Sequence, residues 1–348
     1  MRDGVRLFAG EPMKNILVTG GAGYIGSHIC VELLNQGYGA IVMDNLCNSS
    51  KKALARVEEI TGKRVKFYEA DIREKSAFDE IFTSNDIYGV IHMAGLKAVG
   101  ESVKEPLAYF DNNIGGTIVL LEAMKKHRVK RMIFSSSATV YDLGGEECLK
   151  ETSPLGNSTS PYGRTKSVIE QMLTDIYASD NVWSIVMLRY FNPIGAHKSG
   201  LIGENPKGIP NNLMPYITQV AVGKRERVNV FGGDYNTPDG TCVRDYIHVM
   251  DLADGHIKAI RKFEETGLFV YNLGTGCPQS VLEVIHAFER ANDLQIQYAI
   301  APRRAGDAAK YYANADKAGE ELGWKATRSI EDMCRDSWNW QSKNPDGY

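Results

Sequence analysis

The sequence predicts an α/β protein in which a doubly wound parallel sheet is followed by a smaller α+β substrate-binding lobe. In the first half, short and near-continuous apolar runs alternate with longer amphipathic stretches, which is typical of a parallel sheet with helices on both faces. The first apolar run ends in a glycine-rich loop that opens a helix. After Phe191 the pattern loosens into Gly-, Pro- and Asn-rich segments.

The apolar pattern places the individual elements. The strands expected in the first half are residues 15–19, 40–44, 65–69, 89–93, 131–135 and 184–189. The helices expected along the chain are residues 25–36, 76–84, 106–128, 161–179, 213–222, 248–263, 280–292 and 329–340. We expect residues 1–12 to be an extension without a role in the fold, 13–190 to form the first domain and 191–348 the second lobe. An alternative is that about 246–275 returns to the first domain.

Composition excludes several functional classes. A net charge of −3 without a long Lys/Arg run argues against nucleic-acid binding. No apolar run approaches the roughly 18 residues of a membrane span, and the first residues lack the apolar core of a secretory signal. The six cysteines are scattered, with no C-x-x-C and no histidine at metal-binding spacing. We therefore expect no metal site and a cytoplasmic, reducing location.

The glycine-rich loop indicates a dinucleotide site. Strand 15–19 runs into GGAGYIG, a G-x-x-G-x-x-G pattern formed by Gly20, Gly23 and Gly26. Glycines let the backbone approach a pyrophosphate, and the following helix N-terminus supplies N–H groups and a positive dipole. The second strand ends in Asp44, where an acid suits ribose hydroxyls and repels a 2′-phosphate. This favours a Rossmann-type NAD-binding domain over a tight turn followed by a chance acid.

Residues after the third and fourth strands extend this site. Asp71 can accept a hydrogen bond from an adenine amino group, or it can cap the next helix, and one residue can do both. In the stretch HMAGLK, the small Ala94 and Gly95 allow close approach of a cofactor, and Lys97 can reach phosphate. Each of these residues is equally consistent with an ordinary solvated position.

The stretch SPYGRTK raises the question of catalysis. Ser160 and Pro161 suit a helix start, so Tyr162 and Lys166 share one helix face. A nearby ammonium favours the phenolate and makes a phenol a better base. Alone, the pair is more simply a partly buried tyrosine beside a lysine. With the glycine loop upstream and Ser137 at the end of the fifth strand, it indicates a proton-handling set for oxidising an alcohol or reducing a ketone.

These motifs resemble those of the extended short-chain dehydrogenase/reductase family and, within it, of UDP-glucose (UDP-galactose) 4-epimerases. The resemblance runs from Met13 nearly to Tyr348, and no single motif settles the substrate. It is carried by the order and spacing of TGGAGYIGSH, DNLCNS, HMAGLKAVGES, DNNIGGT, FSSSATVY, SPYGRTK, LRYFNPIGAH, GIPNNLMPYI, DGTCVRDYIHVMDLADGH and RRAGD.

The resemblance implies a set of site residues. Catalysis would use Ser137, Tyr162 and Lys166. NAD would be bound by Gly20, Gly23, Tyr24, Ile25, Gly26, Asp44, Asn45, Asp71, Ile72, Met93, Ala94, Gly95, Lys97, Asn112, Tyr162, Lys166 and Tyr190. UDP-galactose and UDP-glucose would be bound by Lys97, Ser137, Tyr162, Asn192, Asn212, Leu213, Phe231, Arg244, Tyr246, Arg304, Asp307 and Tyr311. Independently of the resemblance, the guanidinium forks of Arg244 and Arg304 suit a diphosphate.

The resemblance also implies an activity. It points to an isomerase of galactose and carbohydrate metabolism that inverts C4 of the hexose through a 4-keto intermediate with tightly bound NAD. Tyr311 would fill the space that a 2-N-acetyl group needs. Helices 106–128 and 161–179 would pair two copies into a homodimer, although packing against the chain's own sheet explains the same apolar faces.

Other enzymes of the same family, and a non-catalytic NAD-sensing module, are the alternatives. Nucleotide-sugar 4,6-dehydratases carry an Asp-Glu pair, and decarboxylases commonly an acid, where this chain has Ala138 and Thr139. A sensing module has no need of Ser137, Tyr162 and Lys166 together. One departure from the epimerase pattern is Asp142, where glycine is usual, so the loop to about residue 154 is expected to run differently.

Overall fold

The computed structural model describes residues 13–143, 145–156, 158, 160–304 and 307–348, so the expected extension at 1–12 lies outside the described residues. The chain divides into two compact units. The first contains the chain up to Ser136, Ser160–Leu188 and His256–Val270, and the second contains Ser137–Thr159, Arg189–Gly255 and Tyr271–Tyr348. Both units are therefore assembled from discontinuous stretches of chain.

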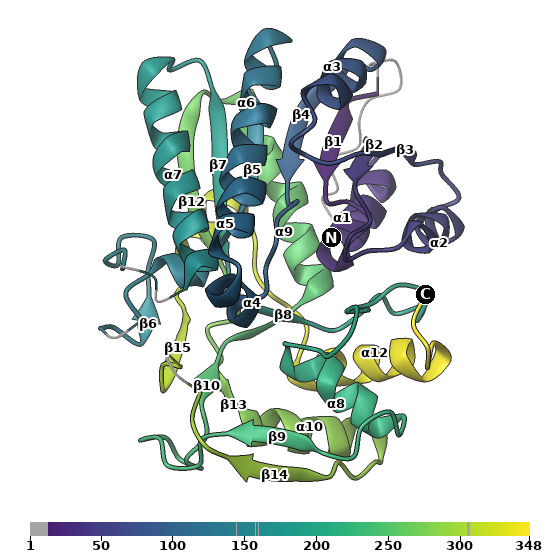
Figure 1. Cartoon of the computed structure of the whole chain (residues 1–348), viewed down its shortest axis with the longest axis vertical. Helices are drawn as coiled ribbons and strands as arrows, with labels where there is room; N and C mark the ends of the chain where they lie inside the picture. Colours follow the sequence, from purple (N-terminus) through teal and green to yellow (C-terminus); the bar gives the residue numbers. More distant parts are fainter. Residues whose placement is uncertain (1–12, 144, 157, 159, 305–306) are drawn as a thin grey trace. The chain divides into compact units, whose positions relative to one another are not determined.

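A seven-stranded sheet in the order β12-β7-β5-β4-β1-β2-β3 confirms the predicted α/β fold (Figure 1). Its strands are β1 (Asn15–Thr19), β2 (Gly39–Asp44), β3 (Lys66–Glu69), β4 (Ile87–His92), β5 (Arg131–Ser137), β7 (Ser184–Tyr190) and β12 (Gly267–Leu273). The pairs β1–β2, β1–β4, β2–β3 and β4–β5 are parallel. The chain reverses its direction of travel across the sheet between β1 and β4, which is where such folds bind ligands.

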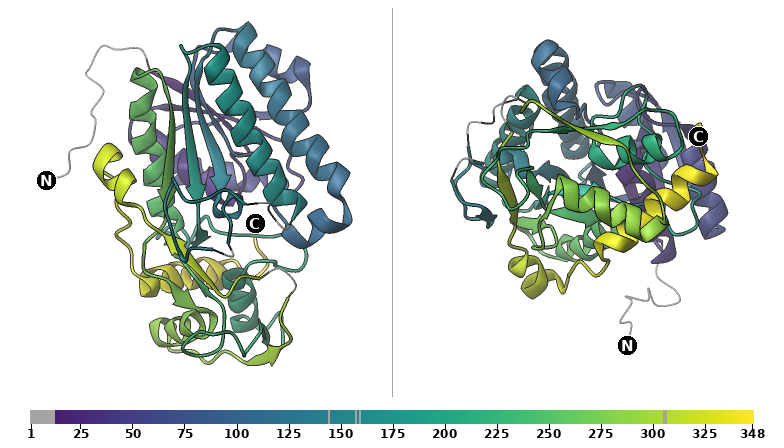
Figure 2. Two further views of the ribbon diagram at one scale, coloured as in Figure 1. Left: turned by 90° about the vertical axis from the view of Figure 1, so that its left-hand side faces the viewer. Right: turned by 90° about the horizontal axis from the view of Figure 1, so that it is seen from below.

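Helices cover both faces of this sheet. They are α1 (Tyr24–Asn35), α2 (Lys51–Thr61), α3 (Lys75–Ser84), α4 (Val99–Lys104), α5 (Pro106–Tyr109), α6 (Gly116–Lys126) and α7 (Pro161–Ser179). Figure 2 shows α6 and α7 together on one side of the strands. On that side, buried side chains of α3, α6 and α7 pack with those of the strands, among them Phe78, Leu120 and Ile169. Each such side chain stabilises the fold by about 1.5–3 kcal/mol.

The helix predicted over residues 106–128 is wrong as a single element. It consists of α5, a π-helical turn at Phe110–Gly115 and then α6. Single π turns inside helices commonly occur at functional positions. Here the turn carries Asn112 and Asn113, both buried, on the side that faces the rest of the unit.

The second unit is built from small sheets and amphipathic helices. One sheet has the order β13-β10-β15-β6, and two others pair β11 with β8 and β14 with β9. The strands are β6 (Cys148–Leu149), β8 (Asn192–Ile194), β9 (Val228–Phe231), β10 (Val243–Arg244), β11 (Tyr246–His248), β13 (Gln279–Ser280), β14 (Tyr298–Ala301) and β15 (Lys310–Ala313). The helices are α8 (Leu213–Ala221), α9 (Val249–Ala259), α10 (Val281–Asn292), α11 (Asp316–Leu322) and α12 (Ile330–Lys343), with 3₁₀ turns at Ala138–Val140 and Ile260–Glu264. Capping boxes at Ser280 and Ser329 explain why α10 and α12 begin as predicted.

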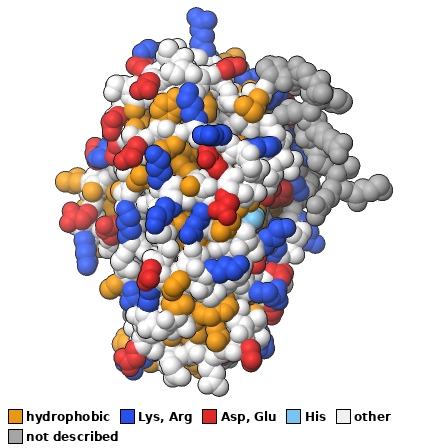
Figure 3. Space-filling view, turned by 90° about the vertical axis from the view of Figure 1, so that its right-hand side faces the viewer, with side chains coloured by type: hydrophobic (Ala, Val, Ile, Leu, Met, Phe, Trp, Pro, Cys, Tyr) orange, Lys and Arg blue, Asp and Glu red, His pale blue; other side chains and the backbone are white. Residues whose placement is uncertain are grey.

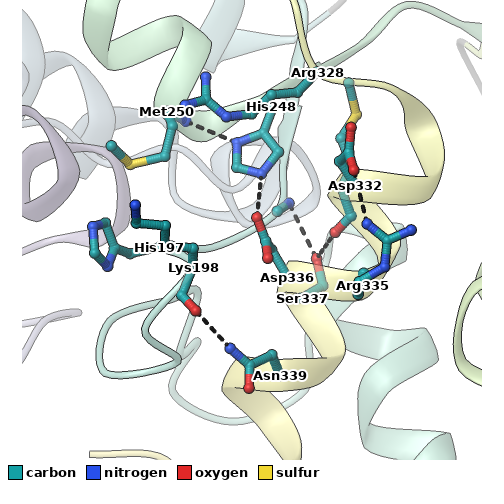
Figure 4. Close-up of polar contacts among 12 residues, drawn as sticks. His197, Lys198, His248, Met250, Arg328, Asp332, Arg335, Asp336, Ser337 and Asn339 are labelled. Atoms are coloured by element: carbon teal, nitrogen blue, oxygen red, sulfur yellow. Dashed lines mark hydrogen bonds and ion pairs between the residues drawn. The ribbon is translucent and has the colours of Figure 1, made fainter.

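A buried histidine joins β11 to α12 in the second unit (Figure 4). His248 accepts a hydrogen bond from the Met250 backbone N–H at Nδ1 (3.0 Å), so its Nε2–H donates to Asp336 (3.1 Å). Gly195 lies directly beside the ring with φ +93°, and a Cβ there would be 2.9 Å from Nε2. Glycine is therefore required at this position, and His248 has a structural role between β11 and α12.

The loop after β5 contains Asp142, the residue that differs from the epimerase pattern, and backbone contacts join the two ends of this loop. Asp142 N–H donates to the Pro154 carbonyl (3.0 Å), and Tyr141 forms an antiparallel bridge with Leu155. Asp142 does not have a positive φ, so this backbone does not require the glycine that is usual there.

The described residues contain no helix long and apolar enough to cross a membrane. Within the same residues no group of three His, Cys, Asp or Glu side chains is arranged to hold a metal ion. On the face shown in Figure 3, basic and acidic side chains are intermingled.

Candidate active site

The glycine loop brings the backbones of β1, α1 and β4 together. Gly20 has φ +71°, and a Cβ there would lie 2.9 Å from the Cα and N of Ala94. A Cβ on Gly26 would collide with the carbonyl oxygen of Gly20. Gly23 is the N-cap of α1, whose first turn carries no acidic residue and includes Tyr24 and Ile25. The helix N-terminus thus keeps its positive end available to an anion, as a pyrophosphate site requires.

Asp44 lies against this loop at the end of β2. Its Oδ2 accepts a hydrogen bond from Ala22 N–H (3.0 Å), and its Oδ1 accepts from Leu46 N–H (2.9 Å) and Ser49 Oγ (2.8 Å). These donors fix a nearly buried carboxylate beside the glycine loop. The ribose-binding role of this acid stays a prediction.

Asp71 is held by an arginine that the sequence analysis did not pair with it. Arg73 donates to both carboxylate oxygens, at 2.8 and 2.9 Å, and this hydrogen bonding holds the Asp71 pKa well below its usual range. Asn45 Nδ2 also donates to Asp71 (2.9 Å). The suggested helix-capping role is wrong, because Glu74 is the N-cap of α3. Ile72, a predicted cofactor residue, is buried and packs directly against the backbone of Gly116.

The end of β4 is organised around a buried neutral histidine. Thr117 Oγ1 donates to the Asn113 carbonyl (2.6 Å), so it accepts from His92 Nε2 (2.9 Å), and His92 Nδ1 accepts from Thr19 Oγ1 (2.7 Å). Thr19 Oγ1 in turn accepts from the backbone N–H groups of Met93 and Ala94 (3.2 and 3.3 Å). Burial, reinforced by the Lys166 charge, lowers the pKa of His92 to about 3. The ring stays uncharged and fixes the loop that begins at Met93.

Asn113 connects this loop to α7. Its Oδ1 accepts from Leu96 N–H (2.8 Å), and its Nδ2 donates to the Leu96 carbonyl and to Thr165 Oγ1 (both 3.0 Å). Asn112, a predicted cofactor residue, donates to the Asn113 side chain (2.9 Å). Asn113 thus bonds both the N–H and the carbonyl of Leu96, and the predicted cofactor residues Gly95 and Lys97 are the neighbours of Leu96 in the chain.

Helix α7 places the phenol and ammonium groups at the end of β5. The Ser160 side chain caps α7 by accepting from Gly163 N–H (3.2 Å), and Pro161 occupies the first turn, as predicted. One turn after the half-buried Tyr162, the buried Lys166 donates from Nζ to the Ser135 carbonyl (2.6 Å). Burial lowers the pKa of Lys166 to about 8, against an opposing effect of Glu170. Glu170 itself accepts from Ser136 Oγ (2.5 Å).

Ser137, the last residue of β5, belongs to the second unit. Its Oγ caps the following 3₁₀ turn, accepting from Thr139 N–H (3.3 Å) and Thr139 Oγ1 (3.1 Å). The position at which dehydratases carry an acid is thus filled by a threonine that orients Ser137.

The second unit gathers the predicted nucleotide-binding residues into a chain of contacts. Arg304 lies over the Phe231 ring (5.0 Å) and donates from Nε to Asp307 (2.9 Å). Arg244 approaches the same carboxylate (3.9 Å) and lies over the Tyr311 ring (4.5 Å). Two guanidinium groups, each lying over an aromatic ring, therefore approach one carboxylate, a combination suited to a diphosphate and a flat base.

The remaining substrate candidates lie nearby in this unit. Asn192 donates from its backbone and side chain to the Asp245 carbonyl (3.0 and 3.3 Å). Leu213 and Tyr246 contribute to one apolar core, and burial raises the pKa of Tyr246. Asn212, at the start of α8, donates to Glu204 (2.8 Å). Tyr190, a predicted cofactor residue, is buried at the end of β7.

The sequence analysis missed the positioning role of His92, Asn113 and Thr117. The signal was clear only for His92, which ends a buried apolar strand, because Asn113 and Thr117 lie in the mixed stretch DNNIGGT. A buried polar side chain needs a partner, but the sequence alone does not say which partner it meets.

A parallel sheet with this glycine loop, Asp44 and the Tyr162–Lys166 pair defines an enzyme of the short-chain dehydrogenase/reductase type. Residues 17–337 match the family described as GDP-mannose 4,6 dehydratase. The chain is 59% identical over 334 residues to the UDP-glucose 4-epimerase of Bacillus subtilis, covering 96% of this chain and 98% of the relative.

Solved structures give the same result. The UDP-glucose 4-epimerase of Bifidobacterium longum in complex with NAD⁺ and UDP is similar with a TM-score of 0.94 and 57% identity, covering 96% of this chain and 100% of that chain. The enzyme from Stenotrophomonas maltophila with bound NAD and formylated UDP-arabinopyranose has a TM-score of 0.93 and 50% identity, covering 95% and 99%. The chain therefore belongs to the NAD-dependent epimerase/dehydratase family, within it to the UDP-glucose 4-epimerases.

The lowered pKa of Lys166 predicts a specific dependence of stability on pH. In the folded chain the pKa of Lys166 is about 8, below its ordinary value of 10.5. Between these values the unfolded chain binds more protons, so the free energy of unfolding rises with pH as the buried charge is lost. K166M lacks this rise, and we expect it to be more stable than the wild type at neutral pH by up to about 2 kcal/mol.

Urea unfolding of both proteins in steps from about pH 7 to about pH 10, without added nucleotide, measures this difference. Other titrating groups are common to both proteins and cancel. We expect the advantage of K166M to shrink as the pH rises. Parallel curves for the two proteins would contradict a pKa lowered by burial.

Proposed function

We propose that this chain reversibly epimerises C4 of UDP-galactose and UDP-glucose through a 4-keto intermediate with tightly bound NAD. The observation that carries the proposal is the Lys166 ammonium, buried on the Ser135 carbonyl one helical turn after Tyr162. This arrangement handles a hydroxyl proton, and the chain's relatives are UDP-glucose 4-epimerases. The first unit is proposed to bind NAD and the second to bind the UDP-sugar.

The residues present fit NAD. Gly20 and Gly26 leave room for a close pyrophosphate, α1 presents an N-terminus without an acid in its first turn, and Asp44 is fixed beside them. Gly20, Gly23, Gly26 and Asp44 would hold the adenosine diphosphate half, while Tyr162 and Lys166 would lie at the nicotinamide end. When bound, NAD would supply the hydride acceptor and donor that oxidation and re-reduction at C4 require.

The chain's own residues manage the proton. Tyr162, as phenolate, takes the proton of the sugar 4-OH and later returns it, and the Lys166 charge favours the phenolate. Ser137, oriented by Thr139, hydrogen-bonds the same sugar oxygen. Because the 4-ketose has to turn over between the two steps, binding has to rest on UDP, which the converging Arg244, Arg304 and Phe231 support.

The sister activities are less well supported. A 4,6-dehydratase has to eliminate water, and it uses acids where this chain has Ala138 and Thr139. Thr139 instead donates to Ser137 and has no ionisable proton to transfer. Redox inversion needs only a bound NAD and the proton-handling residues already described.

A homodimer, a cytoplasmic location and a role in galactose metabolism complete the proposal. Exposed apolar side chains gather on α4 to α7, namely Val99, Val103, Leu107, Ile118 and Val168. Helices α4 and α5 both pack against α7, so this is a group of neighbouring helices. Such apolar groups mark protein interfaces, and a second copy of the chain is the proposed partner. None of the six cysteines, all of which lie in the described part of the chain, forms a disulfide, which suits a reducing location.

Turnover without added cofactor tests the reaction. Purified protein is expected to convert UDP-galactose to UDP-glucose with no NAD supplied, followed by NMR of the sugar. Y162F keeps the ring but loses the proton acceptor, so kcat is expected to fall by about 10²–10⁴-fold with little change in KM. Y177F, the same change on the same helix, serves as the control. Stoichiometric formation of NADH would instead identify a net dehydrogenase.

Tyr311 is expected to exclude N-acetylated sugars. It is half-buried between Arg244 and the Phe191 ring, so its position is fixed. The wild type should reject UDP-N-acetylglucosamine, and Y311S should raise kcat/KM for it by at least about 10-fold. Y312S changes the side chain on the opposite face of β15 and should not. Efficient use of UDP-N-acetylglucosamine by the wild type would refute this specificity.

The proposed dimer is tested by placing a charge on its apolar helices. Leu107 is 80% exposed, and L107E is expected to shift the protein toward monomer in sedimentation velocity at micromolar concentration. I300E, on a 53% exposed residue of the second unit, is the control and should leave the mass unchanged. A wild-type monomer at every accessible concentration would rule out the dimer.

A further inference from the structure

Asp245 is a fully buried carboxylate in the second unit, between the predicted substrate residues Arg244 and Tyr246. Its Oδ1 accepts from Thr275 N–H (2.9 Å) and Thr275 Oγ1 (2.6 Å). Its Oδ2 accepts from Gly276 N–H (2.9 Å) and Ala313 N–H (3.0 Å). Four donors from two separate segments thus satisfy one charge that has no contact with water.

These segments carry the substrate residues. Ala313 ends β15, the strand that contains Tyr311, and β15 pairs with β10 through Arg244 and Tyr311. The backbone carbonyl of Asp245 accepts the hydrogen bonds of Asn192, the first residue of β8. The single residue therefore connects three strands, each contributing a predicted contact to the nucleotide or the sugar.

The packing leaves the carboxylate no freedom to move. A Cβ on Gly274 would lie 2.7 Å from Asp245 Oδ2, so the backbone of that loop touches the carboxylate directly. Neither a longer side chain nor a water molecule fits between them. The position of β15 relative to β10 is consequently set by the position of this charge.

We propose that Asp245 is a positioning residue for UDP-sugar binding: its side chain sets the place of Tyr311 beside Arg244, and its carbonyl sets the place of Asn192. This inference rests on the proposed function of the second unit. Asp245 touches no reacting atom in it. Its effect is on substrate affinity and sugar selectivity rather than on proton or hydride transfer.

The test is D245N, which preserves side-chain volume. An amide presents its NH₂ group to one of the two donor pairs, so β15 or the 275–276 loop has to move. We expect the KM for UDP-galactose and the dissociation constant of UDP, measured by calorimetry, to rise by about 10-fold or more, with kcat changed less than about threefold. Use of UDP-N-acetylglucosamine relative to UDP-galactose should increase, because Tyr311 is displaced.

Asp251 offers a matched control in the same unit. It is 3% exposed and accepts from Thr327 N–H (3.0 Å), Thr327 Oγ1 (3.1 Å), Arg328 N–H (3.0 Å) and the Arg328 guanidinium. None of these donors is a predicted substrate residue. D251N should therefore lower the melting temperature as D245N does, while the KM, the UDP dissociation constant and the selectivity stay at wild-type values.

T275V, which removes one donor and leaves the other three, replaces D245N if that variant does not fold. It should raise the UDP dissociation constant by about two- to fivefold. The inference would be overturned if D245N, or T275V in its place, had the same UDP affinity and sugar selectivity as the control D251N. A wild type that binds UDP but does not epimerise UDP-galactose would overturn the proposed reaction, while the UDP affinities of the variants would still decide the role of Asp245.

Discussion

The ammonium of Lys166 is buried, and a buried charge has to find hydrogen-bond acceptors inside the protein. It finds the Ser135 carbonyl of β5, and Glu170 one turn later binds Ser136 of the same strand. These two contacts fix the position of α7 along the direction of β5. Because Tyr162 lies one turn before Lys166 on the same helix face, its position follows from them. The rest of the first unit's site is arranged around this registration, since Asn113 ties the loop after β4 to Thr165 on the same helix.

Much of this unit follows from local sequence. Strand β1 and the start and end of α7 agree with their apolar pattern and caps, because buried parallel strands and Ser-Pro helix starts have strong local signals. The glycine loop and Asp44 were predictable for a similar reason. Only glycine tolerates the approach of Gly20 to Ala94, and the acid ends the neighbouring strand, so sequence order and spatial order coincide.

Other features were not predictable from local sequence. Asp71 and Arg73 are only two residues apart, yet the same aspartate also fits a helix cap, and only the observed start of α3 excludes that role. The π turn at Phe110–Gly115 has no clear sequence signature and results from the need to bring Asn113 to Leu96 and Thr165. Asp245 is a single acid in the stretch VRDYIH, and its importance appears only when the Thr275 and Ala313 segments are seen to meet it.

The candidate site residues are held in two different ways, some rigidly and some loosely, and this difference suits the proposed reaction. Lys166, His92 and Asp245 are buried and hydrogen-bonded, so their positions are well fixed. Arg304, by contrast, is 54% exposed and bound to Asp307, and such exposed ion pairs contribute only about 0–1 kcal/mol. The guanidinium can therefore exchange the carboxylate for a diphosphate at little cost, which leaves Asp307 free to accept hydrogen bonds from ribose hydroxyls. In the proposed site, a rigid frame with an exchangeable Arg304 would hold the nucleotide firmly while placing little constraint on the hexose, as inversion at C4 requires.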